Sequence, residues 1–211
     1  MCVYNGDNSN IEKIKAIYPY VYYEIADVFC DGKKQGNAIL SKFEILSSSS
    51  KVVQEPSKEK KDYSKEGRIY LEIEVCISDK VLKIGTTHLS YTDRFVETEL
   101  KDKEVKRLIN IIRKNKYGYI FAGDLNMTKT SKYIKNIEEH LRYYETENTW
   151  TTNPFSYNGF EERLLNWKLD YIFSTKDIII KNIRVHKTIV SDHLPLIAEI
   201  LLDQKECYES S

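Results

Sequence analysis

The sequence predicts an α/β protein built from two packed sheets with helices on the outside. Residues 68–77 place an apolar side chain at every second position, as a half-buried strand does. Residues 119–122 are instead apolar or small throughout, as in a strand buried on both faces. Residues 98–116 gather apolar side chains on one face of a helix and charges on the rest. Strands of both kinds beside an amphipathic helix indicate sheets packed face to face and covered by helices.

Turn residues divide the first part of the chain into elements. Pro19 ends a first helix, since proline cannot continue one. Asp31-Gly32 and Asp79-Lys80 each join two strands into a hairpin. Four serines and a run rich in Lys and Glu, about residues 47–66, predict a mobile loop. The predicted elements are a helix at 11–18, a hairpin of strands at 21–30 and 36–46, and a second hairpin at 68–77 and 81–89.

The second part of the chain alternates helices and strands. After the helix at 98–116 comes the buried strand, followed by a helix at 131–141 that Thr130 or Ser131 caps. Residues 146–166 have no regular pattern. The closing strands are predicted at 169–174, 178–187 and 194–202. No internal repeat or linker divides the sequence, so we expect residues 1–211 to form one domain.

Composition excludes several classes of protein. Lys plus Arg and Asp plus Glu are equal at 32 each, so the basic excess of a nucleic-acid coat protein is missing. The four cysteines form no Cys-x-x-Cys pair, which argues against a zinc or redox motif. No run of 18 apolar residues and no signal-peptide core occur, so no membrane span is expected and a cytoplasmic location is predicted.

Polar clusters follow several of the predicted strands. Residues 84–90 end in Thr-Thr-His-Leu-Ser, residues 119–126 in Gly-Asp-Leu-Asn, residues 169–173 read Leu-Asp-Tyr-Ile-Phe, and residues 191–200 begin Ser-Asp-His. In an α/β sheet, ligand sites collect at strand ends of this kind. A turn or helix cap explains Asp-Leu-Asn alone equally well. His140 and His186 have no comparable motif around them.

These four motifs, in this order, are similar to those of the endonuclease/exonuclease/phosphatase superfamily, which has the fold of the DNase-type nucleases. Gly-Asn-Ala-Ile-Leu-Ser-Lys at 36–42 adds a further match, and the resemblance covers roughly residues 36–201. It implies a four-layer α/β/β/α sandwich. It also implies a hydrolase of phosphoester bonds (a phosphodiesterase, nuclease or phosphatase) that depends on Mg²⁺ or Mn²⁺. The substrate would be nucleic acid or a small phosphorylated molecule.

The resemblance assigns a role to each site residue. His193 acts on the attacking water, and Asp170 fixes its tautomer. Asp124 positions or deprotonates that water, so whether Asp124 or His193 is the base stays open. Asn126 holds a phosphate oxygen, and His88 donates to the phosphate and stabilises its charge. Asp192 helps to bind the metal, directly or through water, because hard cations take carboxylate oxygens.

The sequence also departs from the family pattern. Members open with a strand bearing an asparagine and a second strand ending in Gln-Glu, whose glutamate is the principal metal ligand. No Gln-Glu precedes the helix at 11–18, so we expect an N-terminally truncated fold that lacks two inner strands and two site residues. The alternative function is therefore a catalytically impaired fragment or a non-catalytic binding module of the same fold.

Overall fold

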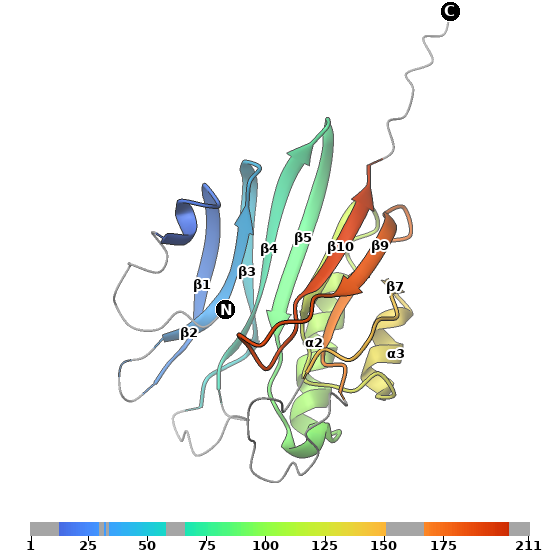
Figure 1. Ribbon diagram of the computed structural model, residues 1–211. Helices are drawn as coiled ribbons and strands as arrows, with labels where there is room; N and C mark the ends of the chain where they lie inside the picture. Colours follow the sequence, from blue (N-terminus) through green and yellow to red (C-terminus); the bar gives the residue numbers. More distant parts are fainter. Residues whose placement is uncertain (1–12, 30–31, 33, 58–65, 151–166, 203–211) are drawn as a thin grey trace, which may run out of the picture.

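The computed structural model describes residues 13–29, 32, 34–57, 66–150 and 167–202. Its centre is a six-stranded sheet with the strand order β3-β4-β5-β6-β8-β7 (Figure 1). All neighbours in this sheet are antiparallel except β5 and β6, which run parallel. The strands are β3 (Ile45–Gln54), β4 (Arg68–Ile77), β5 (Lys80–His88), β6 (Tyr119–Asp124), β7 (Arg142–Tyr143) and β8 (Asp170–Ser174).

The predicted hairpin of β4 and β5 is confirmed, and its turn is tight. Ile77 pairs with Lys80, so the loop consists of Ser78 and Asp79. Both have positive φ, 49° and 62°, as the type I′ turn of a two-residue hairpin requires. Ser and Asp occupy a turn that usually takes Asn-Gly, which explains why the sequence places the turn only to within a residue.

The prediction of a mobile loop at 47–66 is wrong for residues 47–54, because they belong to β3. Ser47 to Gln54 pair with β4 along its outer edge. Most side chains of β3 are exposed, so its sequence lacks the apolar alternation that marks a half-buried strand. The backbone hydrogen bonds offered by β4 stabilise this polar edge strand. Residues 58–65 lie outside the described part of the chain.

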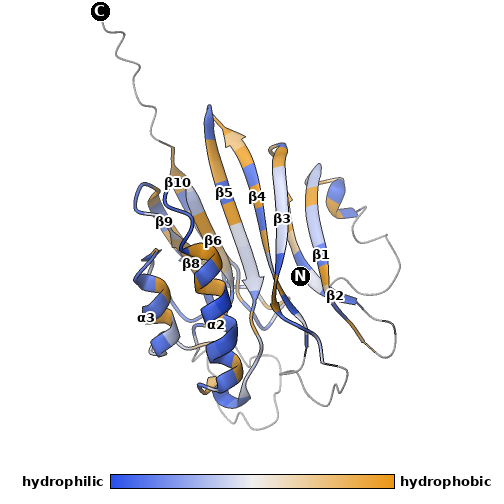
Figure 2. Cartoon of the chain, turned by 180° about the vertical axis from the view of Figure 1, so that it is seen from behind, coloured by the Kyte–Doolittle hydropathy of each residue, from blue (hydrophilic) through white to orange (hydrophobic). Residues whose placement is uncertain are grey.

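Two helices cover one face of the sheet. Helix α2 (Glu99–Ile112) begins at the cap Thr98, which accepts a hydrogen bond from Lys101 N–H, and α3 (Lys132–Glu138) begins at Ser131. Figure 2 shows both helices in front of β6 and β8. Their apolar faces pack on aromatic residues of the strands, and this cluster includes Val105, Leu108, Ile112, Ile134, Ile137, Tyr70, Tyr119, Phe121, Tyr171 and Phe173.

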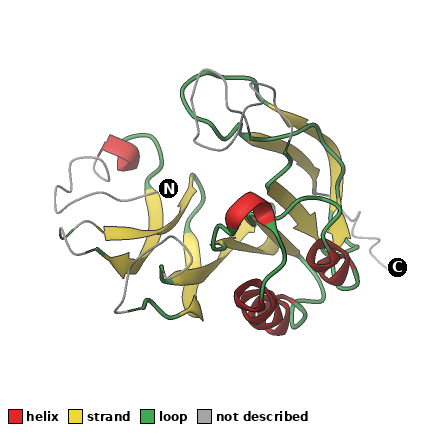
Figure 3. Ribbon diagram, turned by 90° about the horizontal axis from the view of Figure 1, so that it is seen from below, coloured by secondary structure: helices red, strands yellow, loops and turns green. Residues whose placement is uncertain are grey.

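The opposite face of the sheet carries two hairpins. One pairs β1 (Tyr20–Val28) with β2 (Lys34–Ser41), and the other pairs β9 (Ile179–Val185) with β10 (Leu196–Leu201). Side chains of both hairpins pack against one apolar cluster, made of Ile73, Val75, Leu82, Ile120 and Ile172 of the central sheet and Ile178 of the segment before β9. The α/β class and the face-to-face packing are therefore confirmed. Within the described residues, this layer consists of two separate two-stranded sheets, which stand apart in Figure 3.

The N-terminal helix predicted at 11–18 is described only in part. Residues 13–15 are helical, and residues 11–12 lie outside the described part. In the described residues we find no helix whose length and hydropathy would let it cross a membrane. That residues 1–211 form one domain stays a prediction.

Candidate active site

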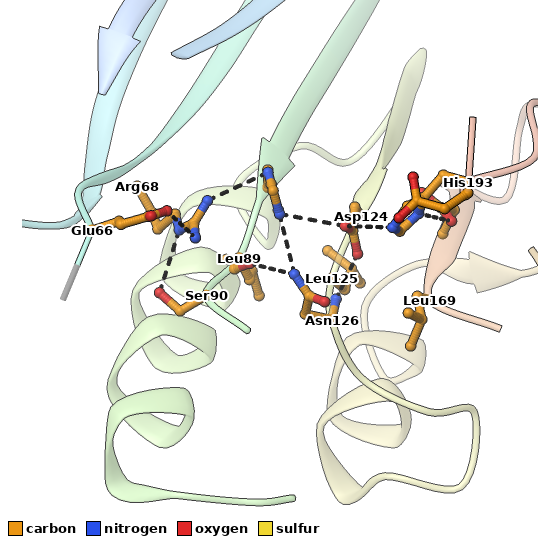
Figure 4. Close-up of polar contacts among 12 residues, drawn as sticks. Glu66, Arg68, Leu89, Ser90, Asp124, Leu125, Asn126, Leu169 and His193 are labelled. Carbon is orange, nitrogen blue, oxygen red and sulfur yellow. Dashed lines mark hydrogen bonds and ion pairs between the residues drawn. The ribbon is translucent and has the colours of Figure 1, made fainter. Parts of the chain in front are cut away.

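Three strand ends bring the predicted residues together. Strands β5 and β6 are parallel and end at the same edge of the sheet, with His88 paired to Asp124. Strand β8 runs the other way and begins at that edge, with Asp170 paired to Asp124. The three residues lie side by side on adjacent strands. Because residues paired directly across strands point to the same face of the sheet, their side chains share one face. Asp124 is therefore the centre of the cluster (Figure 4).

His193 joins the cluster from the segment before β10. Its Nδ1 lies 2.9 Å from Asp170 Oδ2, so the predicted hydrogen bond between these residues is present. The main chain is held by Thr149, whose carbonyl accepts from Leu194 N–H at 2.7 Å and whose hydroxyl accepts from Asp170 N–H at 3.1 Å. One threonine thus fixes both halves of the pair.

The electrostatics of His193 favour its charged form. Burial alone would lower the pKa of the imidazole, but the hydrogen bond to Asp170 and the charges of Asp124, Asp170 and Asp192 raise it to about 9. In the free protein His193 is therefore an imidazolium at neutral pH, with its Nε2 3.7 Å from Asp124 Oδ2.

Asp124 and Asn126 form a tight local turn. Asp124 Oδ1 accepts from Asn126 N–H at 2.8 Å, and Asn126 has a φ of 47°, a conformation that Asn adopts more readily than most residues. The Asn126 side chain is buried and donates to Leu89 O at 3.0 Å. Burial raises the pKa of the Asp124 carboxyl above its ordinary value, against the opposing effect of His88.

His88 lies on the other side of Asp124. Its Nε2 is 3.4 Å from Asp124 Oδ2, and its Nδ1 is 3.4 Å from Arg68 Nη1. Burial, with a smaller effect of the Arg68 charge in the same direction, lowers the pKa of His88 to about 4, although the charge of Asp124 opposes both. Asp124 therefore lies between a neutral imidazole and a charged one.

A second, buried group of charges supports the loops that carry these residues. The Arg68–Glu66 ion pair is 2.9 Å long, and both side chains are less than a tenth exposed. Lys101 Nζ donates to the carbonyls of Ser90 and Leu125, and Ser90 Oγ donates to Glu104 at 2.5 Å. Burial lowers the pKa of Lys101 to about 8.

Sequence reasoning missed this group because no motif contains it. One signal was available: Lys101 precedes Val105, Leu108 and Ile112 on the apolar stripe of the helix, where a charge needs a buried partner. Arg68 and Glu66 gave no such signal, because they lie at the start of a strand beside a polar run.

The predicted metal ligand Asp192 lies beside His193, at the edge of the cluster around Asp124. Ser191 Oγ donates to Asp192 Oδ1 at 3.4 Å, and the charge of Asp192 contributes to the raised pKa of His193. Among the described residues, the group whose ligand atoms lie within 4.8 Å of one another is Asp124, Asp170 and His193, without Asp192. Carboxylate oxygens are the ligands that Mg²⁺ prefers, so the two carboxylates of this group suit a hard cation, whereas the protonated His193 would not bind one.

The fold and this site are those of an α/β protein with a His-Asp pair and an acidic centre at one sheet edge. The chain belongs to the endonuclease/exonuclease/phosphatase family, whose model matches residues 3–193. The match begins well before residue 36, where the motifs alone first indicated the resemblance. A search of curated protein sequences finds no match to the chain.

Solved structures of low sequence identity share the fold. An endonuclease/exonuclease/phosphatase from Bacteroides vulgatus superposes with a TM-score of 0.68 at 19% identity, covering 93% of this chain and 82% of that one. A mannosyl-6-phosphatase of Bacteroides thetaiotaomicron gives 0.61 at 16% identity, covering 92% and 82%. TDP2 of D. rerio, complexed with a single-strand DNA product, gives 0.66 at 16% identity, covering 95% and 84%.

Proposed function

We propose that this protein is a metal-dependent hydrolase of phosphoester bonds. The observation that carries the proposal is the position of Asp124 between the Nε2 atoms of His88 and His193, at 3.4 and 3.7 Å. A phosphate group placed over Asp124 would meet a hydrogen-bond donor on each side. Membership of the family supports the same class of reaction.

The reaction is the attack of water on phosphorus. Asp124 accepts a proton from the water, since its raised pKa makes it a better base than an ordinary aspartate. The bond from the water oxygen to phosphorus forms as the bond from phosphorus to the leaving oxygen breaks. His193, protonated and hydrogen-bonded to Asp170, gives a proton to the leaving oxygen. Asn126 and His88 hold the remaining phosphate oxygens.

Mg²⁺ or Mn²⁺ would be held by the carboxylate of Asp192, with substrate oxygens and waters completing its shell. The carboxylates of Asp124 and Asp170 at the same sheet edge add to the oxygen-rich surroundings that such an ion prefers. When bound, the ion would neutralise charge that develops on the phosphate oxygens.

We propose a narrower range of substrates for this protein than for the family as a whole. The neighbours named above include a sugar phosphatase and a protein with a DNA product, so phosphomonoesters and phosphodiesters are both candidates. The equal numbers of acidic and basic residues disfavour extended binding along DNA. We therefore propose a short or small phosphorylated substrate.

The test is hydrolysis of two chromogenic esters, bis-p-nitrophenyl phosphate and p-nitrophenyl phosphate, by the purified chain. We expect hydrolysis with Mg²⁺ or Mn²⁺, its loss with EDTA, and recovery when the metal is restored. A folded protein that hydrolyses neither ester with either metal would instead support the alternative, an impaired or non-catalytic member of the family.

A further inference from the structure

Arg68 is a buried cation whose guanidinium faces the site. Its side chain is 3% exposed, Nη2 donates to Glu66 Oε2 at 2.9 Å, and Nε lies 3.4 Å from Ser90 Oγ. The remaining terminal nitrogen, Nη1, lies 3.4 Å from His88 Nδ1 (Figure 4). Glu66 and Ser90 thus hold the guanidinium in one position beside the imidazole.

The other nitrogen of His88 faces the centre of the site. Nε2 lies 3.4 Å from Asp124 Oδ2 and 3.1 Å from Asn126 Nδ2. The orientation of the Asn126 amide is set by Leu89, because Nδ2 donates to that carbonyl at 3.0 Å. The ring is therefore flanked by a donor at Nδ1, and by a carboxylate and an amide donor at Nε2.

This arrangement decides where the proton of the neutral ring lies. A guanidinium has no acceptor atom, so Nδ1 can interact favourably with Arg68 only as a bare acceptor. The proton is then on Nε2, where the carboxylate of Asp124 accepts it. The reverse tautomer would direct Nδ1–H at a fixed cation. In the tautomer with the proton on Nε2, two donors face each other at 3.1 Å, so Asn126 loses its hydrogen bond to His88 and keeps the one to Leu89; a neutral amide costs less in that position than a fixed cation.

We propose that Arg68, held by Glu66, is a positioning residue that fixes His88 as the Nε2–H tautomer and so makes it a hydrogen-bond donor to the substrate phosphate. Its counterpart is Asp170, which is an acceptor at Nδ1 of His193 and keeps a proton there. A cation behind one ring and an anion behind the other assign the two imidazoles different roles around Asp124. The donor role rests on the proposed function, whereas the tautomer is a property of the free protein.

The test is the tautomer of His88, measured by long-range ¹H–¹⁵N NMR of the metal-free protein at pH 7.5. The His88 signals are assigned by their loss in His88→Gln. We expect a protonated Nε2 and a bare Nδ1 in the wild type. Arg68→Lys keeps a donor near Nδ1 and should keep this tautomer, whereas Arg68→Met should shift the population toward Nδ1–H.

Two further variants separate this effect from a general disturbance. Arg68→Met leaves Glu66 buried without its cation, so Glu66→Gln/Arg68→Met is the second variant if the single one does not fold. Arg107→Met is the matched control, because Arg107 on α2 donates to the carbonyl of Val53 on β3 at 2.8 Å rather than to His88, and its loss should leave the tautomer unchanged.

Activity gives the second readout. Loss of one aligned donor costs roughly 10²–10³-fold in kcat, so Arg68→Met should lower kcat by up to that factor and Arg68→Lys by less. A wild-type His88 with its proton on Nδ1, or an unchanged tautomer in both Met variants, would overturn the inference. If the tautomer is as expected but no phosphoester is hydrolysed, the inference stands and the proposed function fails. If esters are hydrolysed while His88 carries its proton on Nδ1, the inference alone fails.

Discussion

His193 Nδ1 and Asp170 Oδ2 lie 2.9 Å apart, although 22 residues separate them in the chain. Thr149 connects them a second time, since its hydroxyl accepts from the N–H of Asp170 and its carbonyl accepts from the N–H of Leu194, the residue after His193. The pair is thus fixed by its own hydrogen bond and by its backbone. Such a partner orients an imidazole and stabilises its charged form.

Replacing Asp170 by Asn should lower both the activity and the pKa of His193. The amide keeps the shape of the carboxylate but removes the negative charge that, together with those of Asp124 and Asp192, raises the pKa of His193 to about 9. We expect kcat to fall by roughly 10²–10⁴-fold, the usual worth of a general acid or base. An NMR titration of His193 measures the pKa. If the pKa stayed near 9 in Asp170→Asn, the assigned cause of the shift would be wrong.

The same pair makes stability depend on pH in a defined window. The pKa of His193 is raised from 6.5 in the unfolded chain to about 9, so its stabilising contribution is fully present below pH 6.5 and is lost as the pH rises through 9. The loss should be about 1–3 kcal/mol. The measured quantity is the difference in the free energy of urea unfolding between the wild type and His193→Gln at each pH. Lys101, whose pKa is also shifted, is present in both proteins, so its contribution cancels in this difference. If this difference stayed constant from pH 6 to 9.5, the stabilising contribution of protonated His193 would be refuted.

Lys101 should be among the most sensitive buried residues. It is 1% exposed, lies 3.7 Å from Glu104, and joins the carbonyls of Ser90 and Leu125, which follow the strands of His88 and Asp124. Lys101→Met should cost about 3–5 kcal/mol in the free energy of unfolding, because Glu104 is left buried without its cation.

The control is the double variant Lys101→Met/Glu104→Gln, which also removes the unpaired buried charge. Urea unfolding of the wild type, the two single variants and the double variant gives the coupling energy of the pair. Additive losses would show that Lys101 and Glu104 act independently, contrary to the structure.

Asn126 offers a matched pair of substitutions. Its φ of 47° suits Gly better than Ala, so Asn126→Ala should be less stable than Asn126→Gly by about 1 kcal/mol. Both variants lack the amide that we propose holds a phosphate oxygen, so both should lose activity to a similar degree. Equal stability would indicate that the backbone has relaxed. Activity retained in the Gly variant alone would show that the amide is dispensable.

Periodicity predicted the regular elements well. The alternation that begins at Ile69 marked β4, and the apolar run before Gly123 marked β6. Strand β3 was missed, because its backbone hydrogen bonds depend on β4 rather than on its own polar side chains. Tertiary pairing overrides local composition in such an edge strand.

The site was predictable in part. Strand-end motifs indicated that His88, Asp124 and Asp170 would lie at one edge, and the register of β5, β6 and β8 brings them side by side. The contact of Arg68 with His88 was not predictable, because it depends on how two side chains 20 residues apart pack across neighbouring strands.

The most direct measurement of the central claim compares two histidine variants in the same assay. His193→Asn removes the proposed acid, whereas His186→Asn alters an exposed histidine of the neighbouring hairpin. We predict that metal-dependent hydrolysis of bis-p-nitrophenyl phosphate falls by roughly 10²–10⁴-fold in His193→Asn and stays within about twofold of the wild type in His186→Asn, with both proteins folded. Equal activity of the two variants would contradict the assignment of the reaction to the site around Asp124.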